Sequence, residues 1–146
     1  MPEPKKPQER PGRWERRTRV INRRTGEFSR ALNGHSESFP EEDVMRHRRT
    51  IEAALRSRGK INWERIRPSV VYITEYRNNL REVGVKAALW ERSLKRAGIG
   101  LDAMQQSHPE TALLFELAIG INKEGLDQAD NLLRRVETRR GREGRK

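Results

Sequence analysis

The chain has 146 residues, a length typical of one domain with short extensions. Hydrophobic residues make up 33% of it and charged residues 36%, so only a thin core can form, as in helices packed in one layer or in a chain that completes its core by assembly. Cysteine is absent, which excludes disulfides, zinc–thiolate sites and thiol catalysis.

The net charge of +11 is concentrated at the two ends of the chain. Residues 1–35 hold ten Arg or Lys against four Glu, and residues 134–146 hold seven against two. The 98 residues between them hold fifteen charges of each sign. A neutral body with two basic ends is typical of proteins that bind a polyanion. The sequence therefore predicts a basic N-terminal arm at 1–35, a helical body at 36–133 and a basic C-terminal tail at 134–146.

The N-terminal arm combines many arginines with one tryptophan. Residues 1–12 are rich in proline and charge and predict an extended segment. Residues 13–30 suit either a small hairpin or a short helix, and a loop at 31–38 is expected to follow. Trp14 lies among arginines, which bind phosphates as planar forks, and its ring can stack on a base. We expect nucleic-acid contact here; a solvated tail with Trp14 against the body is the alternative.

The first clear helix is predicted from Pro40 to Gly59. Pro40 suits a first helical turn, and the three acidic residues that follow it complement the positive end of a helix. Val44, Ile51 and Leu55 are expected to form its buried line. Arginines crowd the other face, which indicates either a solvated surface or a wall that contacts phosphates.

The rest of the chain is organised around a predicted helix at 69–97. Apolar residues recur there at alternating spacings of three and four, which produces a helical seam. The seam consists of Ile73, Tyr76, Leu80, Val83, Ala87, Trp90, Leu94 and Ala97. One helix of about 43 Å is expected, with two helices broken at Gly84 as the alternative. Trp63 and Ile66 are expected to plug the end of the core, and Gly98 to end the helix. The predicted fold is all-α, a helical bundle built on this one long helix.

The last third of the chain predicts two further helices. Residues 109–124 are apolar on nearly every side, which is typical of a helix that is central in a bundle or shared between subunits. The candidate subunit contacts are Leu114, Leu117 and Ile121. Gly125 is expected to stop this helix, and residues 126–136 to form the last one.

The residues that could carry chemistry are scattered. His35, His47 and His108 have no second ligand at metal spacing, and His47 is interpreted as a polar surface residue. No nucleophile signature or phosphate-binding loop is visible. We therefore expect no catalytic residue, no metal site and no cofactor, and the protein is predicted not to be an enzyme. The longest apolar run, at 112–121, is too short to span a bilayer, and no apolar signal segment is seen, so no membrane partner is expected.

In outline, a helical body of this size with two basic arms resembles the coat proteins of filamentous viruses, especially the archaeal ones. The resemblance is one of architecture and size. It implies a structural protein that coats and packages a viral genome, DNA rather than RNA, in a helical assembly of many copies. It also implies a place in the virion, assembled in the host cytoplasm. The alternative is a regulatory DNA- or RNA-binding protein of a phage or plasmid, cytoplasmic and nucleoid-associated, with an arginine-rich recognition arm.

The expected contacts to nucleic acid are made to phosphates and carry little sequence specificity, because phosphates hold no base information. They are assigned to the arm, the first helix and the tail. The candidate residues are Arg10, Arg13, Trp14, Arg16, Arg17, Arg19, Arg23, Arg24, Arg30, Arg46, Arg48, Arg49, Arg56, Arg139 and Arg140.

Overall fold

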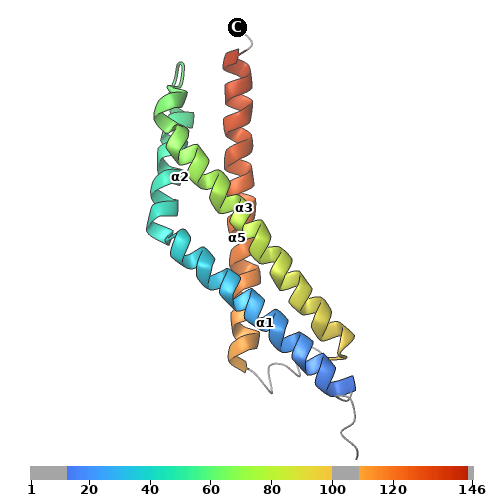
Figure 1. The fold of residues 1–146 in the computed structure, drawn as a ribbon. Helices are drawn as coiled ribbons and strands as arrows, with labels where there is room; N and C mark the ends of the chain where they lie inside the picture. The colour runs from blue at the N-terminus through green and yellow to red at the C-terminus, as the bar shows by residue number, and fades with distance from the viewer. Residues whose placement is uncertain (1–12, 100–108, 145–146) are drawn as a thin grey trace, which may run out of the picture.

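The computed structural model describes residues 13–99 and 109–144, without some side chains at the start of α1 and in the first half of α5. Within these ranges the helices are α1 (Arg13–Ser38), α2 (Glu41–Arg56), α3 (Trp63–Arg96) and α5 (Pro109–Gly144), and no strand is present. α1 and α2 run in succession along one side, α3 returns in the opposite direction, and α5 runs the length of the bundle (Figure 1). The prediction of an all-α fold is confirmed over the described residues.

Helix α3 packs against each of the other three helices, and α2 also packs on α5. The residues of the predicted seam are buried in α3 except for Tyr76, and Ile66 and Ser69, which lie before the seam, are buried as well. Ile73, Leu80, Trp90 and Leu94 are at most 2% exposed, and Tyr76 is half-buried. The helix runs through Gly84 without a break. None of the described helices is both long and apolar enough to cross a membrane.

The ends of α3 have local causes. The Asn62 side chain caps the first turn by accepting the backbone N–H of Arg65 at 3.3 Å, so the helix begins at Trp63 rather than near residue 69. Pro68 therefore lies inside the helix, where one backbone hydrogen bond is lost. At the other end Gly98 has a φ of +71°, and its N–H donates to the Lys95 carbonyl at 3.0 Å. Gly98 ends α3 as predicted, because this left-handed conformation suits glycine.

Two hydrophobic cores lie one after the other along α3. One core joins α1, the C-terminal half of α3 and the start of α5; Phe28 and Trp90 stack there with ring centroids 5.8 Å apart. The other core joins α2, the N-terminal half of α3 and the C-terminal half of α5, and contains Ile51, Ile73 and Leu133. The bundle is elongated, because the two cores follow one another along the length of α3 (Figure 1).

The N-terminal region corrects the prediction of a basic arm at 1–35, and of the two structures considered for 13–30 the helix is the one present. Residues 13–38 form α1, which excludes both the hairpin at 13–30 and the loop at 31–38. Ile21, Phe28 and His35 are buried at seven-residue intervals on one side of this helix. These three residues are spaced as a helix requires, and burial against α3 stabilises a helix that its polar composition alone would not. The segment 1–12 lies outside the described residues.

The C-terminal region corrects two further predictions. Helix α5 passes through Gly125, which was expected to stop it, and extends to Gly144, so most of the expected tail at 134–146 is helical. A Cβ atom built on Gly125 would lie 2.8 Å from the Tyr76 hydroxyl and 3.1 Å from Leu80 Cδ1. Glycine is therefore used at this position for a close approach of α5 to α3 and not for a turn. Ala129, Leu133 and Val136 of the predicted last helix are buried.

Candidate nucleic-acid interface

In the middle of the bundle, several arginines form ion pairs with carboxylates. Asp130 on α5 accepts a hydrogen bond from Arg81 at 3.3 Å and lies 3.7 Å from Arg77 Nε, both on α3. On α2, Arg46 lies 3.4 Å from Asp43. Arg46 was predicted to bind phosphate, but here it is one member of an ion pair. Residues 36–133 also hold as many acidic as basic side chains, so the middle of the molecule carries no net charge.

A groove between the first turns of α1 and the last turns of α3 is different. Its volume is about 510 Å³. It is lined by Arg16, Arg17, Val20, Arg23, Arg24, Ser93, Arg96 and Ala97. Within the described residues, Arg24 alone among these arginines has an ion-pair partner, Glu27 at 3.0 Å. That hydrogen bond lowers the pKa of Glu27. The other four arginines leave this α1–α3 groove strongly positive.

A second basic groove lies at the opposite end, between α2 and the last turns of α5. It is lined by Leu55, Arg134, Arg135, Thr138, Arg139 and Arg142. Arg134, Arg135 and Arg142 are exposed and have no ion-pair partner in the part of the chain that the structure describes. The lining residues Arg135, Thr138 and Arg142 are three and four positions apart, so their side chains follow one side of α5. We call this the α2–α5 groove.

Arg139, at the same end, acts inside the protein. Its guanidinium group donates to the carbonyls of Leu55 at 3.3 Å, Ser57 at 3.0 Å and Gly59 at 2.7 Å. Its Nε also lies 3.5 Å from Glu143 Oε1. These bonds fasten the α2–α3 connection to α5. Arg139 was predicted as a phosphate ligand, and its donors are instead directed at backbone oxygens.

Glu143 completes this fastening from the other side. Its carboxylate accepts the Ile61 N–H at 3.0 Å and the Trp63 indole N–H at 2.6 Å. These bonds and the charge of Arg139 lower the pKa of Glu143, with the Ile61 N–H as the largest cause. The predicted position of Trp63 and Ile66 at the end of the core is confirmed, and the Arg140 guanidinium lies 5.7 Å from the Trp63 ring centroid.

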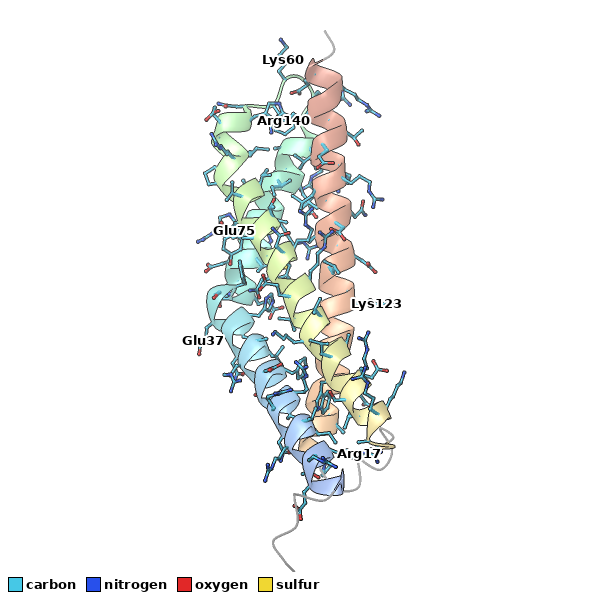
Figure 2. The ribbon with its side chains drawn as sticks, turned by 45° about the vertical axis from the view of Figure 1, so that its right-hand side comes forward. Arg17, Glu37, Lys60, Glu75, Lys123 and Arg140 are labelled. Carbon is cyan, nitrogen blue, oxygen red and sulfur yellow. The ribbon has the colours of Figure 1, made fainter. Side chains whose placement is uncertain are left out.

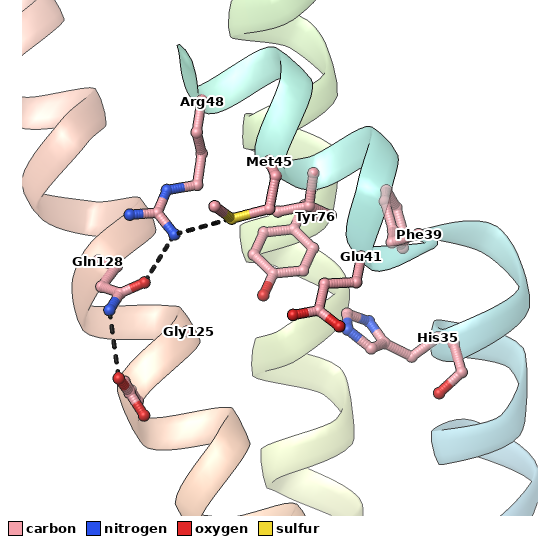
Figure 3. Close-up of a pocket in the computed structure, with 11 residues that line it drawn as sticks. His35, Phe39, Glu41, Met45, Arg48, Tyr76, Gly125 and Gln128 are labelled. Carbon is pink, nitrogen blue, oxygen red and sulfur yellow. Dashed lines mark hydrogen bonds between the residues drawn. The ribbon is translucent and has the colours of Figure 1, made fainter. Parts of the chain in front are cut away.

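A cavity of about 490 Å³ lies between the two grooves, where the four helices meet (Figure 3). Arg48, predicted to bind phosphate, lines it and donates to Gln128 Oε1 at 2.8 Å. The His35 ring packs against Phe39 and Tyr76, and its Nδ1 lies 2.7 Å from Asn79 Oδ1. Burial lowers the pKa of His35 and raises that of Tyr76, so both are neutral near pH 7. Hydrogen bonds of the polar side chains that line the cavity therefore join the helices.

The interpretation of His47 as a surface residue is wrong. The His47 Nδ1 lies 2.8 Å from the Ser69 hydroxyl, and its ring stacks on Tyr72 with centroids 4.2 Å apart. Burial is the main cause that lowers the pKa of His47. The residue therefore joins α2 to α3.

The remaining residues that were predicted to contact nucleic acid or another subunit are spread over the surface or lie outside the part of the chain that the structure describes. Arg19 and Arg30 on α1 and Arg49 and Arg56 on α2 are exposed and line neither groove. Arg10 lies outside the described residues. The same holds for the side chains of Arg13, Trp14, Leu114, Leu117 and Ile121.

Four groove residues were missing from the predicted set: Arg96, Arg134, Arg135 and Arg142. The signal for the last three was the spacing of arginines along 134–142, which becomes visible once that segment is treated as a helix. Arg96 joins the set only when the end of α3 is placed beside α1.

The described residues contain no group of three or more His, Asp or Glu side chains that could hold a metal ion. Comparison of this chain with protein-family models, with curated proteins and with solved structures found no match.

Proposed function

We propose that this protein binds nucleic acid through its phosphate backbone and packages it as a structural component. One observation carries the proposal: Arg46, Arg77 and Arg81 in the middle of the bundle have carboxylate partners, whereas most arginines of the two end grooves have none among the described residues. Unpaired guanidinium groups attract phosphates and release condensed counterions when they bind.

The kind of recognition follows from the chemistry of the grooves. Their polar lining is arginine with one Ser or one Thr, and it includes no Asn or Gln that would read a base edge. Arginine contacts to phosphates position a protein on nucleic acid without reading its sequence. Binding with little sequence preference suits a packaging protein better than a regulator of a few sites.

The finer form of the proposal is a coat that assembles along a viral genome, DNA rather than RNA. Leu113, near the start of α5, is 57% exposed and could contact another copy of the chain. It belongs to the helix for which Leu114, Leu117 and Ile121 were predicted as subunit contacts. Contacts between copies through this segment would propagate along a polymer if they are head-to-tail.

The salt dependence of binding to a 40-base-pair duplex tests the proposal. For the unmodified chain, log affinity should fall linearly with log salt concentration. Replacing Arg16, Arg17 and Arg23 by Gln should make that slope shallower by about 2.7, at about 0.9 for each phosphate that is no longer neutralised. Circular dichroism should show the same helix content, because all three side chains are partly or fully exposed.

The matched control is the triple variant of Arg30, Arg49 and Lys123 to Gln, which removes the same charge from exposed residues that line neither groove. Its slope should change by less than half as much. Equal slopes for the two triple variants would mean that net charge and not the grooves governs binding. A strong preference for one duplex sequence, or equal affinity per site on short and long duplexes, would contradict the coat and favour the regulator.

A further inference from the structure

The two basic grooves lie at opposite ends of the bundle. Arg96, the last residue of α3, lines the α1–α3 groove. The α2–α5 groove lies beside the other end of α3, where Arg139 holds the carbonyl of Gly59 and Glu143 accepts from Trp63. Figure 2 shows Arg17 at one end, and Lys60 and Arg140 at the other. The 34 residues of α3 span roughly 50 Å at 1.5 Å per residue, so the grooves are separated by about that distance.

The surface between the grooves is unsuited to a single duplex lying along the molecule. A duplex in contact over about 50 Å would present phosphates along roughly 15 base pairs, at 3.4 Å per step of each strand. The middle of the bundle would then need cations that face it. Instead, residues 36–133 carry no net charge: Arg77 and Arg81 are paired with Asp130, and Glu37 and Glu75 project from the middle as well as Lys123 (Figure 2).

Each end has enough charge to bind by itself. The α1–α3 groove holds four arginines without a described ion-pair partner, and the α2–α5 groove holds three. Val20, 39% exposed between the arginines of α1, leaves the first groove open to a ligand. The framework between the two grooves is rigid, because α3 and α5 are continuous helices that pack on each other along the bundle.

We propose that a single molecule binds one nucleic-acid segment at each end and thereby holds two segments together. This inference rests on the proposed function, and it specifies how packaging would occur: by cross-bridging of segments. The α1–α3 groove and the α2–α5 groove are then two separate binding sites for the phosphate backbone.

A capture experiment tests the inference. One 40-base-pair duplex is fixed to beads, protein is added below saturation, and capture of a second, fluorescent duplex is measured. The unmodified chain should capture the second duplex. The triple variant Arg16→Gln, Arg17→Gln, Arg23→Gln should still bind the first duplex, and its capture of the second should fall at least tenfold. The triple variant Arg134→Gln, Arg135→Gln, Arg142→Gln should behave in the same way.

The control is again the variant with Arg30, Arg49 and Lys123 changed to Gln, three exposed residues outside both grooves, whose capture should stay within twofold of the unmodified chain. Combining both groove variants should abolish binding to either duplex. Circular dichroism of each variant confirms that the fold is kept.

The contrary outcomes are distinct. If the unmodified chain binds no duplex, the proposed function itself is wrong. If it binds one duplex but captures no second, the proposed function stands and cross-bridging is wrong. If one groove variant loses all binding while the other keeps full capture, copies joined to each other bridge the duplexes through a single groove, and the two-site inference is overturned.

Discussion

Replacing Gly125 by Ala tests the close approach of α5 to α3 directly. An added Cβ would lie 2.8 Å from the Tyr76 hydroxyl and 3.1 Å from Leu80 Cδ1, so these side chains must move. Tyr76 is held by ring contacts with His35 and Phe39, and Leu80 is 2% exposed, which leaves little room for movement. Overpacking of this kind costs about 1–3 kcal/mol.

The helix propensity of alanine offsets part of that cost. Ala is better than Gly inside a helix by about 1 kcal/mol. The net change in the free energy of unfolding for Gly125→Ala should therefore be a loss of about 0–2 kcal/mol. Gly120 is the matched control: it lies about one and a half turns earlier in α5, and a Cβ there would meet nothing within 4 Å. Gly120→Ala should gain about 1 kcal/mol.

Urea unfolding followed by circular dichroism gives both values, and their difference should be about 1–3 kcal/mol. Changing Tyr76 to Phe removes the nearest atom, so Gly125→Ala should cost less in that background, with a coupling energy of about 1 kcal/mol. Equal gains for Gly125→Ala and Gly120→Ala would refute the close approach. A loss that Tyr76→Phe does not relieve would assign the clash to Leu80 Cδ1 and not to the Tyr76 hydroxyl.

Three other predictions concern stability. Burial keeps the pKa of His35 in the folded protein below its ordinary value of 6.5, so the unfolded chain binds a proton at this residue more readily than the folded protein does. The free energy of unfolding should therefore have its full value above pH 6.5 and decrease as the pH falls below it. His35→Gln should flatten this pH dependence, measured by urea unfolding at each pH. Arg139→Ala should cost about 2 kcal/mol in urea unfolding, because three carbonyls lose a charged donor, whereas Arg134→Ala should stay within about 0.5 kcal/mol; equal costs would contradict the fastening role. Leu80→Asp should cost at least about 3 kcal/mol, since it places a charge in the seam of α3, and Glu75→Ala should be nearly neutral; thermal melting by circular dichroism separates them, and similar melts would show that the wrong face was assigned.

The sequence by itself determined features whose causes are local. The buried face of α3 was predictable because seam residues three and four apart must share one side of a helix, and Gly98 was recognised as its end because a left-handed residue favours glycine. Composition likewise placed the positive charge at the two ends of the chain. The zero net charge of residues 36–133 likewise follows from counting charged residues, without knowledge of which of them form ion pairs.

Only the tertiary structure decided the features that depend on distant residues. The segment 13–38 is polar enough to resemble an arm, and it becomes a helix because α3 offers a surface that buries Ile21 and Phe28. Gly125 resembles a stop until Tyr76 is seen against it. Arg139 bonds to carbonyls 80 to 84 residues away in the chain, whereas Arg134 and Arg135 remain unpaired among the described residues. All three are arginines of one basic segment, so the sequence alone cannot distinguish their roles. Finally, α3 returns the chain to the end of the bundle where α1 begins, and α5 then runs the length of the bundle, so that the two basic ends of the chain lie at opposite ends of it.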